Sequence, residues 1–94
     1  MSYKLTKKAE ADLVAIVDFS LERFGSATAL RHLDSLERSL EALCRGDFEG
    51  PELTIASRAR PVRRWPVLPH WIYYVRVSGE LRVLRLYHSS REPL

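Results

Sequence analysis

The chain contains one cysteine, Cys44, among its 94 residues. A single cysteine excludes an internal disulfide and a zinc site built from several cysteines. No apolar run approaches the roughly 20 residues that span a bilayer, and the residues after Met1 include no apolar stretch of the kind found in signal peptides. We therefore expect a cytoplasmic protein with no membrane association, and we expect neither a metal nor a cofactor.

Lysine is absent from the second half of the chain. Residues 1–53 contain seven Lys or Arg and ten Asp or Glu, a net charge of −3, whereas residues 54–94 contain eight Arg and two Glu, a net charge of +6. The arginine fork matches the geometry of phosphate and carboxylate groups, while lysine acts as a point charge. The basic half therefore indicates an acidic partner, either nucleic acid or an acidic protein segment, with a merely solvated surface as the alternative.

The length fits one small domain, residues 1–94, with a single modest core. Hydrophobic residues make up 46% and charged residues 29% of the chain, a balance that is typical of a globular protein and not of a disordered one.

Two neighbouring segments space their apolar residues as one face of an α-helix does. The first segment follows Thr6, a suitable N-cap, and carries Ala9, Leu13, Ile16, Val17, Ser20 and Phe24. The second follows Gly25 and carries five leucines, a stripe too short for a zipper and therefore expected in the core: Leu30, Leu33, Leu36, Leu40 and Leu43. The single glycine between the helices predicts a tight antiparallel hairpin.

Residues 47–59 contain Gly50 and show no clear period, so we predict a loop there. Three segments after the loop are rich in β-branched and aromatic residues and predict strands. The first should end before Pro66, because proline lacks the N–H that a strand donates. The three predicted strands are residues 62–65, 71–77 and 81–88.

Ser78 and Gly79 fit a two-residue hairpin turn between the last two strands. In the last strand, Leu84 and Leu86 alternate with Arg85 and Tyr87, which predicts one buried and one exposed face. With a short strand at residues 3–5, the order is β-α-α-β-β-β. The predicted fold class is α+β: an N-terminal strand, an antiparallel helical hairpin, and a three-stranded antiparallel sheet with the helices on one face.

The ordered set of these features resembles the ParE branch of the ParE/RelE toxin superfamily over nearly the whole chain. The N-terminal part of the resemblance rests on Tyr3-Lys4-Leu5-Thr6, Ala9, Asp12-Leu13, Ile16, Phe24-Gly25, Ala29, Leu33 and Gly50. The C-terminal part rests on Ile72-Tyr73-Tyr74-Val75-Arg76, on Leu81 to His88, and on the ending His88-Ser89-Ser90-Arg91-Glu92-Pro93.

The resemblance implies the toxin component of a type II toxin–antitoxin system, which arrests growth by inhibiting DNA gyrase through binding. It also implies a cognate antitoxin whose C-terminal segment wraps the toxin, in a heterotetramer or larger complex. Two alternatives remain open. One is a RelE-like, ribosome-dependent mRNA endoribonuclease, and the other is a toxin fold that has lost toxicity and only binds its partner.

For a ribonuclease, the resemblance indicates an acid, a base and a cation on the sheet. The candidates in this sequence are Tyr87, His88 and Arg91. The basic half has no lysine and no Tyr or His follows Arg91, which departs from the RelE pattern and favours binding over catalysis. The alternative role for His88 is a hydrogen bond to the C-terminal tail.

Six arginines are candidates for contact with the antitoxin or the target: Arg58, Arg60, Arg63, Arg64, Arg85 and Arg91. His32 and His70 have no metal-ligand spacing to each other or to an acidic residue, so we expect surface or packing roles for both. Four aromatic residues fit either base stacking or ordinary packing, and a small domain favours packing: Trp65, Trp71, Tyr73 and Tyr74.

Overall fold

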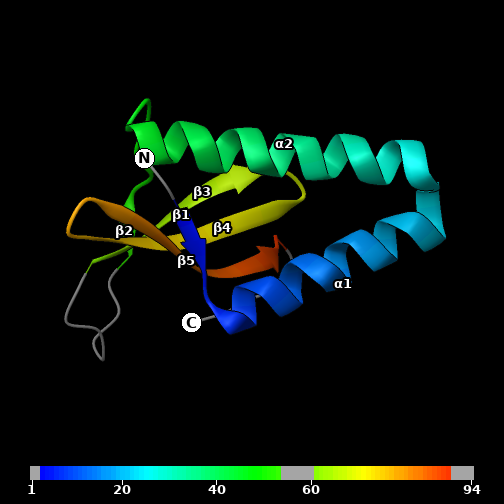
Figure 1. Ribbon diagram of the computed structural model, residues 1–94, viewed down its shortest axis with the longest axis horizontal. Helices are drawn as coiled ribbons and strands as arrows, with labels where there is room; N and C mark the ends of the chain where they lie inside the picture. Colours follow the sequence, from blue (N-terminus) through cyan, green and yellow to red (C-terminus); the bar gives the residue numbers. More distant parts are fainter. Residues whose placement is uncertain (1–2, 54–60, 90–94) are drawn as a thin grey trace.

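Two helices lie on one face of a five-stranded sheet in the computed structural model, which describes residues 3–53 and 61–89 (Figure 1). The elements in chain order are β1 (Tyr3–Leu5), α1 (Lys7–Phe24), α2 (Ser26–Arg45), β2 (Glu52–Leu53), β3 (Val62–Val67), β4 (His70–Val77) and β5 (Glu80–His88). The strand order in the sheet is β1-β5-β4-β3-β2. The predicted α+β class and helical hairpin are confirmed.

The sheet is larger than the three antiparallel strands predicted from the sequence. β1 joins it parallel to β5, with Tyr3 opposite Leu81 and Leu5 opposite Val83. β2 lies inside the predicted loop and pairs antiparallel with β3. The strand at residues 3–5 is confirmed, but its place in the sheet was not predicted, because a parallel pair depends on residues far apart in the chain. β2 has no local signal, because two residues are too few to show a period of two.

β3 continues through Pro66, contrary to the prediction that the strand would end there. β2 pairs only with Val62 and Arg63, so the rest of β3 has a strand neighbour on one side, β4, within the described residues. A proline is tolerated on such an edge because its missing N–H is not required by a second neighbour.

The cap of α1 and the turn between β4 and β5 are formed by the residues predicted for them. The Thr6 hydroxyl accepts the N–H of Ala9 at 3.1 Å, as predicted for an N-cap, and donates to the Leu84 carbonyl at 2.8 Å. This second bond fixes the start of α1 against β5. Ser78 (φ 51°) and Gly79 (φ 78°) form the predicted two-residue turn, in which both residues have positive φ.

The main core lies between the helices and the sheet. It contains Ile16 of α1, the buried leucines of α2 (Leu36, Leu40 and Leu43), and sheet residues such as Ile72 and Tyr74. Leu30, which we expected in the core, is 65% exposed, and Phe24, placed by its spacing on the apolar side of the first helix, is 62% exposed. Figure 1 gives the reason, because the end of the hairpin where α1 meets α2 projects past the sheet.

Several side chains on the opposite face of the sheet, which the helices do not cover, are also buried. Val62, Tyr73, Val75 and Tyr87 form a second apolar cluster there. The prediction of an exposed face carrying Tyr87 is therefore wrong, since Tyr87 is 9% exposed. A register shift between Tyr73 and Tyr74 places one extra residue in β5 and interrupts the simple alternation.

Replacement of Gly50 by alanine should destabilise the protein by about 3 kcal/mol, because a methyl group there overlaps the backbone carbonyl of Arg64. Both Gly50 backbone groups are also bonded, the N–H to the Tyr74 hydroxyl and the carbonyl to Arg63. Urea unfolding of Gly50→Ala measures the loss. The control is Gly46→Asn, at an open left-handed position, which should cost about 1 kcal/mol. Equal costs for the two variants would contradict this interpretation.

Candidate functional site

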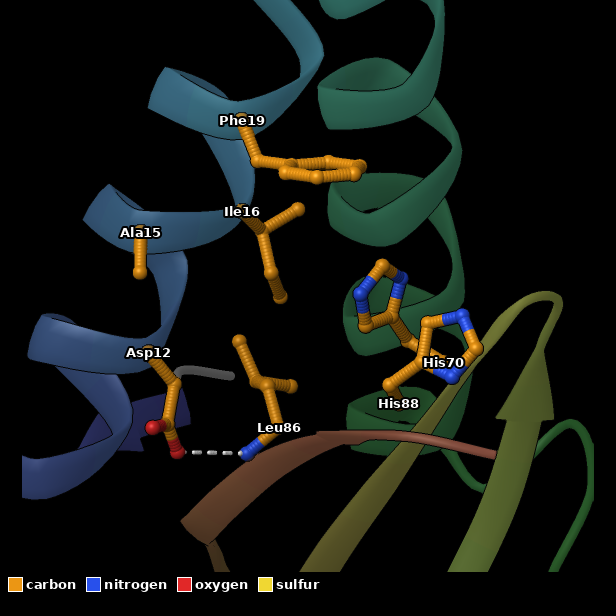
Figure 2. Close-up of a pocket in the computed structure, with 7 residues that line it drawn as sticks. All are labelled: Asp12, Ala15, Ile16, Phe19, His70, Leu86 and His88. Atoms are coloured by element: carbon orange, nitrogen blue, oxygen red, sulfur yellow. Dashed lines mark hydrogen bonds between the residues drawn. The ribbon is translucent and has the colours of Figure 1, made fainter. Parts of the chain in front are cut away.

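A pocket of about 320 Å³ opens between α1 and the adjacent ends of β4 and β5. Figure 2 shows its apolar wall on α1 and the two imidazoles of the sheet on the other side. The lining residues are Asp12, Ala15, Ile16, Phe19, His70, Leu86 and His88. An apolar pocket with a few polar groups at its margin is the usual form of a binding site for a small molecule or a single partner side chain.

Asp12 connects the floor of this pocket to β5. Its carboxylate accepts the backbone N–H of Leu86 at 3.0 Å (Figure 2) and two hydrogen bonds from the Arg85 guanidinium, at 2.7 and 2.9 Å. The bond to Asp12 raises the pKa of Arg85, whose guanidinium also lies 4.3 Å from the centre of the Tyr87 ring. The charge of Arg85 is therefore compensated inside the protein.

All three histidines of the chain meet beside the pocket, although they come from three different elements. His32 Nε2 of α2 lies 3.0 Å from His70 Nδ1 of β4, which is hydrogen-bond distance. His88 of β5 is directly opposite His70 in the sheet, and the two rings meet edge to face with centroids 5.5 Å apart. The sequence-based expectation of packing roles for His32 and His70 missed this cluster, because its residues are far apart in the chain.

Two of the three rings, His32 and His70, are neutral at physiological pH. Burial, followed by the nearby His32 and His88 rings, lowers the pKa of His70 to about 4, and burial lowers the pKa of His32. In the neutral pair one imidazole donates and the other accepts. A ring with so low a pKa is a poor general base near pH 7. Among residues 3–53 and 61–89, no group of three His, Cys, Asp or Glu side chains is arranged to hold a metal ion.

The structure does not bring together the residues predicted for a ribonuclease. Tyr87 belongs to the apolar cluster on the sheet face away from the helices, whereas His88 lines the pocket on the helical side. Neighbouring residues of a strand point to opposite faces, so these two side chains cannot converge on one phosphate. Arg91, the third candidate, lies outside the described residues.

Three of the six predicted contact arginines, Arg63, Arg64 and Arg85, lie in strands of the described sheet. Arg63 binds the Gly50 carbonyl at 2.6 Å. Arg64 stacks over Trp71 with its guanidinium carbon 4.2 Å from the ring centroid, and it shares one row across the sheet with Tyr73 and Arg85. Three of the predicted arginines, Arg58, Arg60 and Arg91, lie outside the described residues.

The aromatic candidates have packing roles. Trp65 stacks on Phe48 with centroids 4.1 Å apart, and Trp71 lies beneath Arg64. The Tyr74 hydroxyl donates to Glu49 at 2.7 Å, and this bond, after burial of the ring, contributes to raising the pKa of Tyr74 to about 12. Glu49 also accepts hydrogen bonds from Arg76, which fixes the segment after α2 against β4.

The fold and the full length match one known family. A family model described as the ParE toxin of type II toxin–antitoxin system, parDE, matches residues 3–93. A solved structure described as the chromosomal ParDE TA system from P. aeruginosa is similar with a TM-score of 0.74 and 25% identity, covering 94% of this chain and 95% of that chain. The comparison with curated proteins gave no match. No helix within the described residues is long and apolar enough to cross a membrane.

The histidine cluster predicts an acid-sensitive stability. As pH falls, the unfolded chain binds a proton at His70 near pH 6.5, whereas the folded protein does so only near pH 4. His70 is thus neutral at no cost above pH 7 and destabilises the fold progressively below it. Allowing for solvent screening, the loss between pH 7.5 and 5 is about 1 kcal/mol. His70→Gln should flatten this part of the melting-temperature profile, while His88→Gln should keep most of the slope. Identical slopes in the wild type and His70→Gln would contradict the assignment.

Asp12→Asn should cost about 2 kcal/mol of stability, because it removes a charge-assisted bond and leaves the partly buried Arg85 without its counter-ion. The matched control is Asp34→Asn, which breaks an exposed pair with Arg38 on α2 and should cost less than about 0.5 kcal/mol. Chemical denaturation of both variants gives the comparison. Equal losses of stability in Asp12→Asn and Asp34→Asn would refute the importance assigned to Asp12.

Proposed function

The chain belongs to the ParE toxin family of type II toxin–antitoxin systems, and on this basis we propose that it arrests growth by binding DNA gyrase without cleaving a bond. Gyrase is the target that is typical of this family. Because gyrase acts on chromosomal and plasmid DNA, the proposal places the toxin in the cytoplasm.

The observation that carries the binding mechanism is the placement of Tyr87 and His88 on opposite faces of the sheet. Cleavage of RNA through its 2′-hydroxyl needs a base, an acid and a cation around one phosphate. Here Arg85, the cation nearest to these residues in sequence, is already bound to Asp12. Inhibition by binding requires no such convergence.

The same family membership implies an antitoxin partner, and the surface supports this. Five large apolar side chains of the helical hairpin are at least 45% exposed: Val14, Phe19, Leu21, Phe24 and Leu30. Exposed apolar surface of this extent on a small domain marks a protein–protein contact. We propose that the C-terminal segment of the antitoxin covers it, and that two toxins assemble with two antitoxins in a heterotetramer or a larger complex.

One feature favours the ribonuclease alternative. On the sheet face that the helices leave uncovered, Arg64 stacks over the partly buried Trp71, and Arg85 lies in the same row as Arg64. Arginines interleaved with aromatic rings are common in surfaces that bind single-stranded RNA. An assay on gyrase and on ribosome-bound message separates the two functions.

Purified toxin should abolish DNA supercoiling by gyrase, and an equimolar amount of antitoxin should restore it. His88→Ala should inhibit gyrase as strongly as the wild type, since the proposed mechanism uses no imidazole chemistry. Agarose-gel supercoiling assays give this readout, with relaxation of DNA by a gyrase-independent topoisomerase as the control. Unaffected supercoiling together with cleavage of ribosome-bound message, lost in His88→Ala, would transfer the assignment to the ribonuclease.

A further inference from the structure

The facing imidazoles of α2 and β4 form a contact that the proposed function does not use. His32 Nε2 and His70 Nδ1 lie 3.0 Å apart, and the two rings are tilted by 41° with their centroids 5.0 Å apart. His88, the third histidine of the chain, is directly opposite His70 in the sheet. The fold therefore brings every imidazole of the chain to one place, beside the pocket.

The separation of the two facing nitrogens is close to that of two imidazoles bound to one metal ion. Zinc binds imidazole nitrogen at about 2.0–2.1 Å, so two such ligands at a tetrahedral angle have nitrogens about 3.3 Å apart. Moving His32 Nε2 and His70 Nδ1 apart by about 0.3 Å and tilting the rings makes room for the ion. The χ2 torsion of histidine has a broad minimum, so ring rotation supplies this displacement without a change of the backbone.

Both rings are in the protonation state that binds a metal. A ligand nitrogen needs a free lone pair, which a neutral imidazole has at one of its two nitrogens. Burial lowers the pKa of His32, and burial followed by the two neighbouring rings lowers the pKa of His70 to about 4. An ion between the rings moves the proton of their hydrogen bond to the far nitrogen of the same ring. Each ring then keeps one proton, at His32 Nδ1 and at His70 Nε2.

The pocket gives an ion access to the pair. His32 and His70 are both partly exposed, and His70 lines the pocket. Figure 2 shows the His70 ring on the sheet side of the opening, across from Ile16 and Phe19 of α1. Within residues 3–53 and 61–89, no three His, Cys, Asp or Glu side chains are arranged around one point. The protein thus supplies two ligands, and water supplies the others.

We propose that His32 and His70 bind one divalent transition-metal ion of the Zn²⁺ class, which cross-links the first half of α2 to the start of β4. Imidazole nitrogen suits Zn²⁺, Cu²⁺ and Ni²⁺, whereas the hard ions Mg²⁺ and Ca²⁺ prefer oxygen ligands. An ion that binds the folded chain more tightly than the unfolded chain stabilises the fold. The site is independent of the proposed toxin function, which uses no imidazole.

Nitrogen-15 spectra of the untagged wild-type protein identify the ligands directly. The chain has three histidines and therefore six ring nitrogens, two in each ring. Titration with Zn²⁺ should shift the signals of His32 Nε2 and His70 Nδ1 and leave both nitrogens of His88 near their starting positions. Equal shifts in all three rings, or a shift in His88 alone, overturn the assignment to this pair.

Thermal unfolding measures the cross-link. At a Zn²⁺ concentration ten times the Kd, the unfolding midpoint of the wild type should rise by about 5–10 °C. The same concentration of Mg²⁺ should leave it unchanged. His32→Gln and His70→Gln should each lose the rise and bind Zn²⁺ at least about tenfold more weakly by calorimetry, since even the loss of an outer partner of a metal site has an effect of this size.

The matched control is His88→Gln, which removes an imidazole from the same cluster but leaves the two facing nitrogens in place, and it should keep both the rise and the affinity. Circular dichroism and the midpoint in the presence of a chelator confirm that each variant is folded, and the spectra of the wild type decide the question where a variant is not.

A wild type that Zn²⁺ does not stabilise overturns the proposal. A rise of equal size in the wild type, His32→Gln and His70→Gln places the ion elsewhere and also overturns it. Loss of the rise in His88→Gln overturns the two-ligand site in favour of three imidazoles. Inhibition of gyrase is measured separately, so failure of the metal site and failure of the proposed function are distinguishable.

Discussion

The Asp12 carboxylate is the contact on which the arrangement of helix, sheet and pocket depends. β1 has only three residues, so β5 beyond Val83 has no strand neighbour on that side within the described residues. Its peptide groups would remain unpaired at an edge. Asp12 accepts the Leu86 N–H, and the Thr6 hydroxyl donates to the Leu84 carbonyl, so α1 closes this edge with side chains. The start of α1 is thereby fixed, while its far end projects freely.

Because only the start of α1 is bonded to β5, the exposed apolar side chains gather toward its far end. The first half of α1 is held by Thr6 and Asp12 against β5, and its apolar residues enter the core. The second half passes the end of the sheet, so Phe19 and Phe24 retain large exposed fractions. A domain of 94 residues cannot cover two long helices completely with one small sheet. The apolar surface that remains is available to a partner, as a toxin that must be neutralised requires.

The sequence was sufficient for features that depend on neighbouring residues. Thr6 is a cap, Ser78-Gly79 is a turn, and the leucines at 36, 40 and 43 are buried, because each follows from local geometry. It was insufficient where the partner residue is distant. The pair of His32 and His70 spans 38 positions. Periodicity likewise placed Phe24 on an apolar side of α1 but carried no information on how far the sheet extends beneath the helix.

In the candidate site, too, the sequence did not show which distant residues come together. Residues chosen for their chemical type, such as Tyr87 and His88, are neighbours in sequence but lie on opposite faces of the sheet. The groups that do converge include the neutral imidazoles of His32 and His70 and the Asp12 carboxylate, which is already bound by Arg85 and Leu86. The Asp12 charge is compensated, and the pKa of His70, about 4, is too low for proton transfer near pH 7. What the described surface offers is a group of exposed apolar side chains on the helical hairpin, which suits the recognition of another protein.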